Sequence, residues 1–298
     1  MNTMLNRKSG ANPSLRELLG RAEPVLAPGA YDALSARIIE QAGFPAVYMT
    51  GFGTAASLLG RPDVGLLGMA EMAGNAARIA QVVDVPVIAD ADTGYGNPLN
   101  VIRTVREYER AGIAAIHIED QILPKKCGHM DNKQVIEPAE MAEKIRAAVE
   151  ARRSEEFLII ARTDARAVEG LEGALRRARL YREVGADALF VEGPQSEEEI
   201  AAVAGAFPQA PLLFNWAEGG KTPPMPLERL KELGYRIIIF PISALLVAAK
   251  AVREVMAQIR RDGTPIRVAI DFMAFAEFNN LVGLDEIKDL ERRFAVRK

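Results

Sequence analysis

The sequence predicts an α/β protein, a (β/α)8 barrel of the TIM type followed by an extra C-terminal helical segment. Short apolar runs rich in β-branched residues alternate with longer segments of helical period, and eight such runs can be counted. Regular alternation of this kind indicates parallel strands joined by helical crossovers, and eight units are the number that closes the barrel. A doubly wound open sheet is the alternative, but no Gly-x-Gly-x-x-Gly motif follows the first strand.

The apolar runs give the expected strands at residues 25–27, 46–50, 86–92, 114–120, 157–164, 188–192, 212–215 and 236–241. Between them, apolar residues recur every three or four positions, which predicts helices at residues 32–42, 70–82, 100–111, 138–151, 171–184 and 196–204. A last barrel helix is expected at residues 243–261. We therefore assign residues 1–263 to a barrel domain.

The remaining residues, 264–298, are expected to form additional helix. This segment carries many aromatic and apolar side chains, including Phe272, Phe275, Phe278 and Phe294. Side chains of this kind outside a barrel need a surface that covers them. The barrel wall and a second subunit are both possible partners, and a subunit contact would make the tail an interface.

Composition limits the function classes. The chain has 298 residues, 49% of them hydrophobic and 26% charged, which is ample for a large core. A formal net charge of −3 argues against nucleic-acid or acidic-membrane partners. A single cysteine excludes an internal disulfide framework and suggests a reducing compartment. With no secretory leader or long apolar span in view, we expect a cytoplasmic protein.

The single cysteine lies in an unusual segment. Cys127 follows Lys125 and Lys126 and precedes Gly128 and His129, just after an expected strand. Nearby cations lower the pKa of a thiol, which suits a residue that gives or takes a proton. Taken alone, the segment could equally be an exposed loop with no chemical role.

Polar residues follow several of the expected strands, at the barrel face that carries active sites. Asp90 and Asp92 are two positions apart, so both should project to one side of their strand, with Glu119 on the next strand. Carboxylates gathered in this way need protons or a cation. Oxygen ligands favour Mg2+ or Mn2+ over zinc, and Mg2+ retains several water molecules. Helix caps or ion pairs with Arg162 and Lys125 are the structural alternative.

Two further groups could bind an anion. Arg162, at a strand end, offers bidentate binding of a substrate carboxylate. The segment Thr50-Gly51-Phe52-Gly53 could present backbone N–H groups to an anionic oxygen, although a plain turn is the simpler interpretation of its glycines.

Together, several motifs closely resemble the isocitrate lyase and phosphoenolpyruvate mutase superfamily. They are, in order, YMTGFG, GRPDVG, DADTGYGN, HIEDQ, KKCGH, ARTDA, FVE and NWAEGGKTPP, and the resemblance runs from about residue 15 to residue 263. It implies a (β/α)8 barrel, a Mg2+ cofactor, and a homotetramer in which the final helix is swapped between neighbours.

The resemblance also implies roles for individual residues. Asp90 matches the direct Mg2+ ligand, and the residues that hold the ion through water are Asp63, Asp92 and Glu119. The positions that match substrate-binding residues are Thr50, Gly51, Phe52, Arg162, Glu192 and Asn215. The positions that match catalytic residues are Tyr48 below the metal site and Lys125, Cys127 and His129 on a loop that closes over substrate. Of these, Cys127 matches the proton donor.

The implied activity is Mg2+-dependent carbon–carbon cleavage of a 2-hydroxy dicarboxylate, such as an alkylmalate, to pyruvate and a carboxylic acid. The segment 218–223 and the pair Met130-Asp131 differ from the usual methylisocitrate lyase pattern and favour a dicarboxylate. Carboxyphosphonoenolpyruvate mutase and 2-methylisocitrate lyase activities remain alternatives, and a non-catalytic barrel that binds a 2-oxo acid is a remote one.

Overall fold

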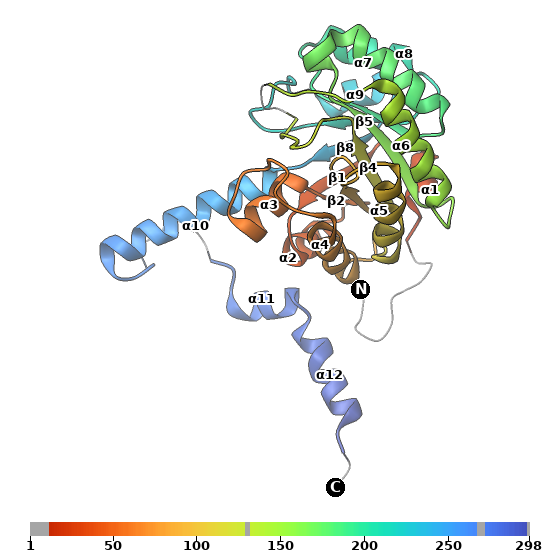
Figure 1. The fold of residues 1–298 in the computed structure, drawn as a ribbon. Coiled ribbons are helices and arrows are strands. Elements are labelled where there is room, and N and C mark those ends of the chain that lie inside the picture. Colours follow the sequence, from red (N-terminus) through yellow and green to blue (C-terminus); the bar gives the residue numbers. More distant parts are fainter. Residues whose placement is uncertain (1–11, 129–131, 267–271, 297–298) are drawn as a thin grey trace.

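The protein is a closed barrel of eight parallel strands, which confirms the predicted fold class (Figure 1). The structure, a computed structural model, describes residues 12–128, 132–266 and 272–296. Each strand pairs with the next in the chain, and β8 pairs with β1. In chain order the strands are β1 (Val25–Ala30), β2 (Val47–Met49), β3 (Val87–Asp90), β4 (Ala115–Glu119), β5 (Leu158–Thr163), β6 (Ala188–Val191), β7 (Leu212–Asn215) and β8 (Tyr235–Phe240).

Helices surround the barrel, as Figure 1 shows, and most follow the predicted segments. These are α2 (Ala33–Gln41), α4 (Met69–Val82), α5 (Pro98–Arg110), α6 (Pro138–Ala151), α7 (Arg166–Glu183), α8 (Glu197–Ala206) and α10 (Ser243–Asp262). Inside α7 the chain kinks at Gly170 (φ 75°, ψ 178°), so the regular helix resumes where the periodicity predicts it. Three helices were not predicted: α1 (Leu15–Leu19), α3 (Gly51–Leu59) and α9 (Leu227–Leu233).

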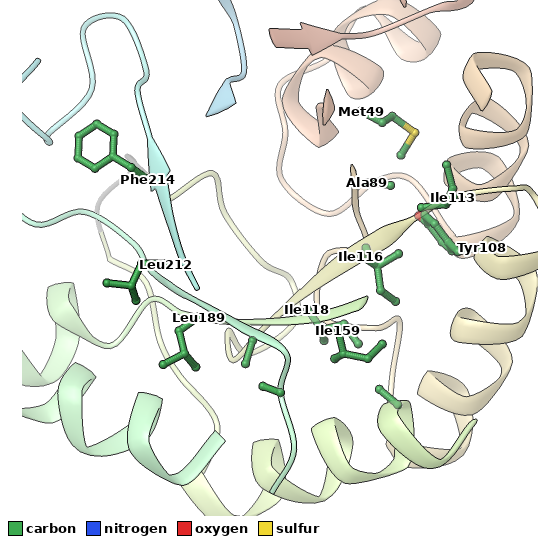
Figure 2. Close-up of a cluster of buried hydrophobic side chains, with 14 of the residues drawn as sticks. Met49, Ala89, Tyr108, Ile113, Ile116, Ile118, Ile159, Leu189, Leu212 and Phe214 are labelled. Atoms are coloured by element: carbon green, nitrogen blue, oxygen red, sulfur yellow. The ribbon is translucent and has the colours of Figure 1, made fainter. Parts of the chain in front are cut away.

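The strands separate two hydrophobic cores, because successive strand side chains point to opposite faces. On β5, Leu158 and Ile160 belong to the cluster inside the barrel, whereas Ile159 belongs to the cluster between barrel and helices. Figure 2 shows part of the outer cluster, with side chains from β2, β3, β4, β5, β6 and β7 facing the helical layer. The inner cluster therefore defines which strand positions point toward the barrel axis.

Helix α1 belongs to the same inner cluster. Leu15 and Leu18 are buried with the inward side chains of the strands. Arg236, on β8, donates to the carbonyl of Leu19 at 2.8 Å, so the first helix is tied to the last strand. The beginning of the described chain thus contributes to the core that the barrel encloses.

The C-terminal segment leaves the barrel along α10 (Figure 1). The tail touches the barrel wall again at α2, where Arg37 and Gln41 donate to the carbonyl of Leu281 at 3.1 and 3.3 Å. Among the described side chains of α10, only Gln258 is buried, and Val247 is 70% exposed. The tail beyond it forms α11 (Phe275–Leu281) and α12 (Leu284–Phe294), which confirms that it is helical, and Phe275 is 83% exposed. Within the described ranges, no helix combines the length and the apolar character needed to cross a membrane.

The β1–β8 seam leads to a prediction about stability. A Cβ atom at Gly29 would overlap the backbone of Pro241, which cannot move aside without disturbing the end of β8. We expect Gly29→Ala to lower the free energy of unfolding by about 1–3 kcal/mol in urea denaturation, as overpacking typically does. Gly205→Ala on α8 is the control, since a Cβ there meets open space and the helix should tolerate it. Equal stability of the two variants would contradict the prediction.

Candidate active site

The inward rows of the strands end in polar side chains at one end of the barrel. Ile88 of the inner core is followed two positions later by Asp90, and Ile160 by Arg162. Strand register then brings neighbours together, because Asp90 pairs with His117 and Glu119 pairs with Arg162. These side chains are buried or nearly so, and they form a polar layer on top of an apolar one.

A cavity of about 230 Å3 opens above this layer. Of the residues predicted for the site, those that line it are Tyr48, Thr50, Phe52, Asp63, Asp90, Lys125, Cys127, Arg162, Glu192 and Asn215. Three others lie at its margin without lining it, namely Gly51, Asp92 and Glu119. His129 lies outside the described residues. Residues assigned from motifs scattered over more than 150 positions thus surround one space.

Lys125 holds two of the predicted metal-binding carboxylates. Its Nζ lies 2.6 Å from Asp63 Oδ1 and 2.5 Å from Asp92 Oδ1, and its side chain is almost fully buried. Burial alone would lower the pKa of Lys125, but the carboxylates of Asp92 and Glu119 raise it well above its usual value. The side chain is therefore a fixed cation in this structure.

Asp92 reaches this position differently from the prediction. Strand β3 ends at Asp90, so Asp92 does not continue the inward row of the strand. Its φ of 47° is left-handed, and its N–H donates to Asp90 Oδ1 at 2.9 Å. A turn closed by the side chain of Asp90, and not strand periodicity, brings the second carboxylate to Lys125.

Arg162 faces three carboxylates. Its guanidinium lies 3.2 Å from Glu119, 2.9 Å from Asp164 and 3.8 Å from Glu192, and it stacks over the ring of Phe190 at 5.1 Å. Glu192 in turn accepts from Asn215 Nδ2 at 3.1 Å. The arginine is held in one orientation, with the cavity in front of it.

Tyr48 and His117 form a pair beneath the cavity. The Tyr48 hydroxyl and His117 Nε2 are 2.9 Å apart, and the two rings are stacked. Burial lowers the pKa of His117 to about 4, and burial raises the pKa of Tyr48 well above its usual value, so both groups are neutral near pH 7. No role was predicted for His117. It could have been predicted to point into the barrel, because it lies two residues before Glu119 on the same strand and therefore on the same face.

The segment after β2 is a helix N-terminus and not a plain turn. Thr50 is the N-cap of α3, and its hydroxyl accepts from the N–H of Gly53 at 3.2 Å. Gly51 is needed there, because a Cβ would overlap the carboxylate of Asp90. Helix N-termini favour anions, so this end of α3 can meet a substrate carboxylate.

Asp120 supports the site from outside the barrel. It accepts from the hydroxyls of Thr163 at 2.7 Å and Tyr181 at 2.9 Å and from the N–H of Asp164 at 2.9 Å. Arg177 adds an ion pair at 3.4 Å. Asp120 continues the row of β4 side chains that point away from the barrel axis, after Ile116 and Ile118. Its hydrogen bonds to Thr163 and Asp164 hold the end of β5 in place. This network was not predicted, because the partners of Asp120 lie 43 to 61 residues from it in the chain.

The chemistry of the acidic groups fits a hard divalent cation. Neither oxygen of buried Glu119 accepts a hydrogen bond from the described residues. Burial raises the pKa of Glu119 well above its usual value and that of Asp92 to about 6, so a nearby cation would stabilise both charged forms. In the described parts of the chain, no three acidic, histidine or cysteine side chains converge as direct ligands. A site with few direct carboxylate ligands would suit Mg2+, because this ion retains several of its water molecules.

The fold is a (β/α)8 barrel, and buried acidic side chains, an arginine and a loop thiol surround one cavity at its end. These features are typical of enzymes that act on carboxylates with the help of a metal ion. The family model described as phosphoenolpyruvate phosphomutase matches residues 15–260. The chain belongs to this family, within the isocitrate lyase and phosphoenolpyruvate mutase superfamily.

Similar curated proteins include two lyases and a mutase. The chain is 48% identical to 2,3-dimethylmalate lyase of Eubacterium barkeri, over 94% of this chain and 97% of that protein. It is 47% identical to 2-methylisocitrate lyase of Aeropyrum pernix, over 94% and 89%. It is 44% identical to the chloroplastic carboxyvinyl-carboxyphosphonate phosphorylmutase of Arabidopsis thaliana, over 91% and 81%.

Solved structures agree with these relationships. A crystal structure of 2,3-dimethylmalate lyase superposes with a TM-score of 0.89 at 43% identity and covers 93% of each chain. Oxaloacetate acetylhydrolase with 3,3-difluorooxalacetate gives 0.90 at 40% identity, over 94% and 95%. Phosphonopyruvate hydrolase, in complex with oxalate and Mg2+, gives 0.85 at 34% identity, over 94% and 97%.

Proposed function

We propose that this protein is a Mg2+-dependent carbon–carbon lyase that cleaves a 2-hydroxy dicarboxylate, such as 2,3-dimethylmalate, to pyruvate and a carboxylic acid. The observation that carries the proposal is the position of Cys127, which lines the same cavity as Asp90 and Arg162. A thiol there can supply a proton to a fragment held by the arginine. The 48% identity to 2,3-dimethylmalate lyase supports this choice of substrate class.

Substrate binding would use the two sides of the cavity. The N-terminus of α3, with Thr50, Gly51 and Phe52, would bind the carboxylate of the pyruvate half. Arg162 would bind a carboxylate of the other half, with Glu192 and Asn215 beside the leaving fragment. The fixed orientation of Arg162 keeps the cost of ordering this contact low, because the guanidinium does not have to be immobilised when substrate binds.

Mg2+, or Mn2+ in its place, would be held by Asp90 directly and by Asp63, Asp92 and Glu119 through water, and it would polarise the hydroxyl and carboxylate of the substrate. The buried carboxylates in this set, two of which are paired with the cation Lys125, would hold the substrate hydroxyl, and one of them would accept its proton as the base. The hydroxyl of neutral Tyr48 would accept a hydrogen bond from the Nε2–H of neutral His117 and would donate its own proton in a hydrogen bond to an oxygen that gains negative charge.

Cleavage of the bond between C2 and C3 would leave the electron pair on C3, in the fragment that becomes the carboxylic acid, while C2 becomes the carbonyl carbon of pyruvate. Cys127 would then donate its proton to that carbon, and Lys125 and His129 on the same loop would assist. The half-buried position of Cys127 is compatible with exclusion of bulk water from the carbanion.

Two other activities in the family stay as alternatives. The 44% identity to a phosphorylmutase keeps phosphorus transfer open, and the 47% identity to a 2-methylisocitrate lyase keeps a tricarboxylate substrate open. A cytoplasmic location also stays a prediction from composition.

We also propose a homotetramer, with a barrel domain at residues 1–263 and a tail at residues 264–298 that packs on neighbouring subunits. The exposed apolar side chains of α10 and of the tail support this, among them Val247, Met256 and Phe275. Clusters of exposed apolar groups on projecting helices indicate a protein partner.

The function is tested by pyruvate release from 2,3-dimethylmalate, other alkylmalates and 2-methylisocitrate, coupled to lactate dehydrogenase. We expect turnover of an alkylmalate with Mg2+, loss of turnover in EDTA, and recovery when Mg2+ is restored. Phosphonopyruvate and carboxyphosphonoenolpyruvate form a separate arm. Turnover only in that arm, or only of 2-methylisocitrate, would contradict the proposed substrate class.

Replacing the proton donor should separate chemistry from binding. We expect Cys127→Ser to lower kcat by about 10²–10⁴-fold, the usual contribution of general acid–base catalysis, because serine is a far weaker acid. Mg2+ binding, measured by titration calorimetry, should be retained, since Cys127 is not a proposed ligand and the substitution keeps its backbone N–H, which donates to the carbonyl of Asp63. Unchanged kcat would rule out Cys127 as the donor.

The assembly is tested by multi-angle light scattering. We expect a mass four times that of the 32.4 kDa chain. Phe275→Asp in α11 should produce smaller species, because a charge would be buried in the interface. Leu99→Asp on α5 is the control, since Leu99 is also exposed but lies on the barrel, and a tetramer in both variants would exclude α11 from the interface.

A further inference from the structure

Lys133 is a buried lysine that the proposed mechanism does not use. Its ammonium donates to the carbonyl oxygen of Gly128 at 2.5 Å and to Asp164 Oδ1 at 2.7 Å. The side chain is 2% exposed, so these contacts are made away from solvent. Lys133 therefore joins the residue after Cys127 to an acidic group at the end of β5.

The same carboxylate orients the arginine of the cavity. Asp164 Oδ2 accepts from Arg162 Nε at 2.9 Å, and Oδ1 accepts from Nη2 at 3.1 Å. Burial would raise the pKa of Asp164, but the charges of Arg162 and Lys133 hold it well below its usual range. Arg162 faces three carboxylates, and Lys133 supplies a second positive charge to that group.

Cys127 is also held from its other side. Gln121 donates from Nε2 to the Lys126 carbonyl at 2.8 Å and accepts from the Lys126 N–H at 2.9 Å. The N–H of Cys127 donates to the carbonyl of Asp63 at 3.2 Å. Hydrogen bonds therefore hold the backbone at Lys126, before the cysteine, and at Cys127 itself. Lys133 holds the backbone after it, at Gly128.

The backbone after Cys127 has little room to move, because Gly128 is closely surrounded by other side chains. A Cβ at position 128 would lie 2.6 Å from Arg162 Nη2 and 2.7 Å from Glu192 Cδ. The backbone of Gly128 thus lies directly against the side chains proposed to bind the leaving fragment. A small displacement of this carbonyl would move Cys127 relative to Arg162.

We propose that Lys133 is a positioning residue, which holds the Cys127 thiol at the cavity by tying the Gly128 carbonyl to the Asp164–Arg162 pair. Its catalytic consequence rests on the proposed role of Cys127 as proton donor. The positioning itself does not depend on which substrate is cleaved. Loss of Lys133 should free the cysteine segment and leave Arg162 bound to Asp164.

The direct test is alkylation of Cys127 by iodoacetamide, which is clean because the chain has one cysteine. In Lys133→Met we expect the alkylation rate to rise about tenfold, because two hydrogen bonds that close the segment are lost. Lys144→Met is the matched control, because Lys144 is also a buried lysine but belongs to α6, outside the cysteine segment, and its rate should equal that of the unchanged protein. Thermal unfolding of each variant checks that the barrel is intact.

Kinetics supply a second readout that a purely structural role would not give. With an alkylmalate, Lys133→Met should lower kcat about 10²-fold, the effect of misplacing a reacting group by about 1 Å, with little change in KM. Lys133→Arg keeps the charge and the donors, so it should restore much of kcat and slow the alkylation. If Lys133→Met fails to fold, Lys133→Gln, which keeps a donor toward Gly128, should show an intermediate alkylation rate.

The outcomes separate this inference from the proposed function. Unchanged alkylation in folded Lys133→Met or Lys133→Gln overturns the inference, whatever the substrate proves to be. Faster alkylation in the variant, together with no turnover of any alkylmalate by the unchanged protein, supports the positioning role and contradicts the proposed substrate class. A parallel fall of kcat and rise of KM, with no rescue by Lys133→Arg, would assign Lys133 to general stability and overturn the inference as well.

Discussion

Closure of eight parallel strands is the constraint on which the rest of this structure depends. Because the side-chain period of a strand is two, each strand sends one row of residues toward the axis, and closure makes the eight rows converge. Ile88 and Ile160 fill the interior, and Asp90 and Arg162 follow them in the same rows. The polar layer is thus the continuation of an apolar core, which fixes its geometry and removes it from bulk water.

Much of this could be predicted from the sequence. Parallel strands in a barrel are buried on both faces, so they appear as continuous apolar runs, and the long helices between them carry a strong period. The predicted strands are correct within a few residues, and α6 matches the prediction at both ends. The short helix α1 and the glycine-rich start of α3 were missed, because neither is long or periodic enough to signal a helix.

Within the candidate site, single residues were easier to predict than their contacts. Polar side chains at strand ends are visible in the sequence, and most of them do line the cavity. Ion pairs of the strand-end carboxylates with Lys125 and Arg162 were the structural alternative, and they occur at Asp92 and Glu119. The second partner of Lys125, Asp63, is not visible in the sequence, because it lies 62 residues earlier. Lys133 looks like an ordinary loop lysine until the fold buries it against Asp164. Contacts between distant segments depend on the completed barrel.

The connection between α1 and β8 has a consequence for how the chain folds. The guanidinium of Arg236 and the carbonyl of Leu19 are 217 residues apart in sequence, and β1 is hydrogen-bonded to β8 along four residue pairs. Contacts between such distant residues form slowly, because the chain loses the conformational entropy of a long loop before the favourable free energy of the contact compensates for it. A growing chain therefore leaves the ribosome with its first strand unpaired on one side, and that open edge is protected only when the last strand arrives.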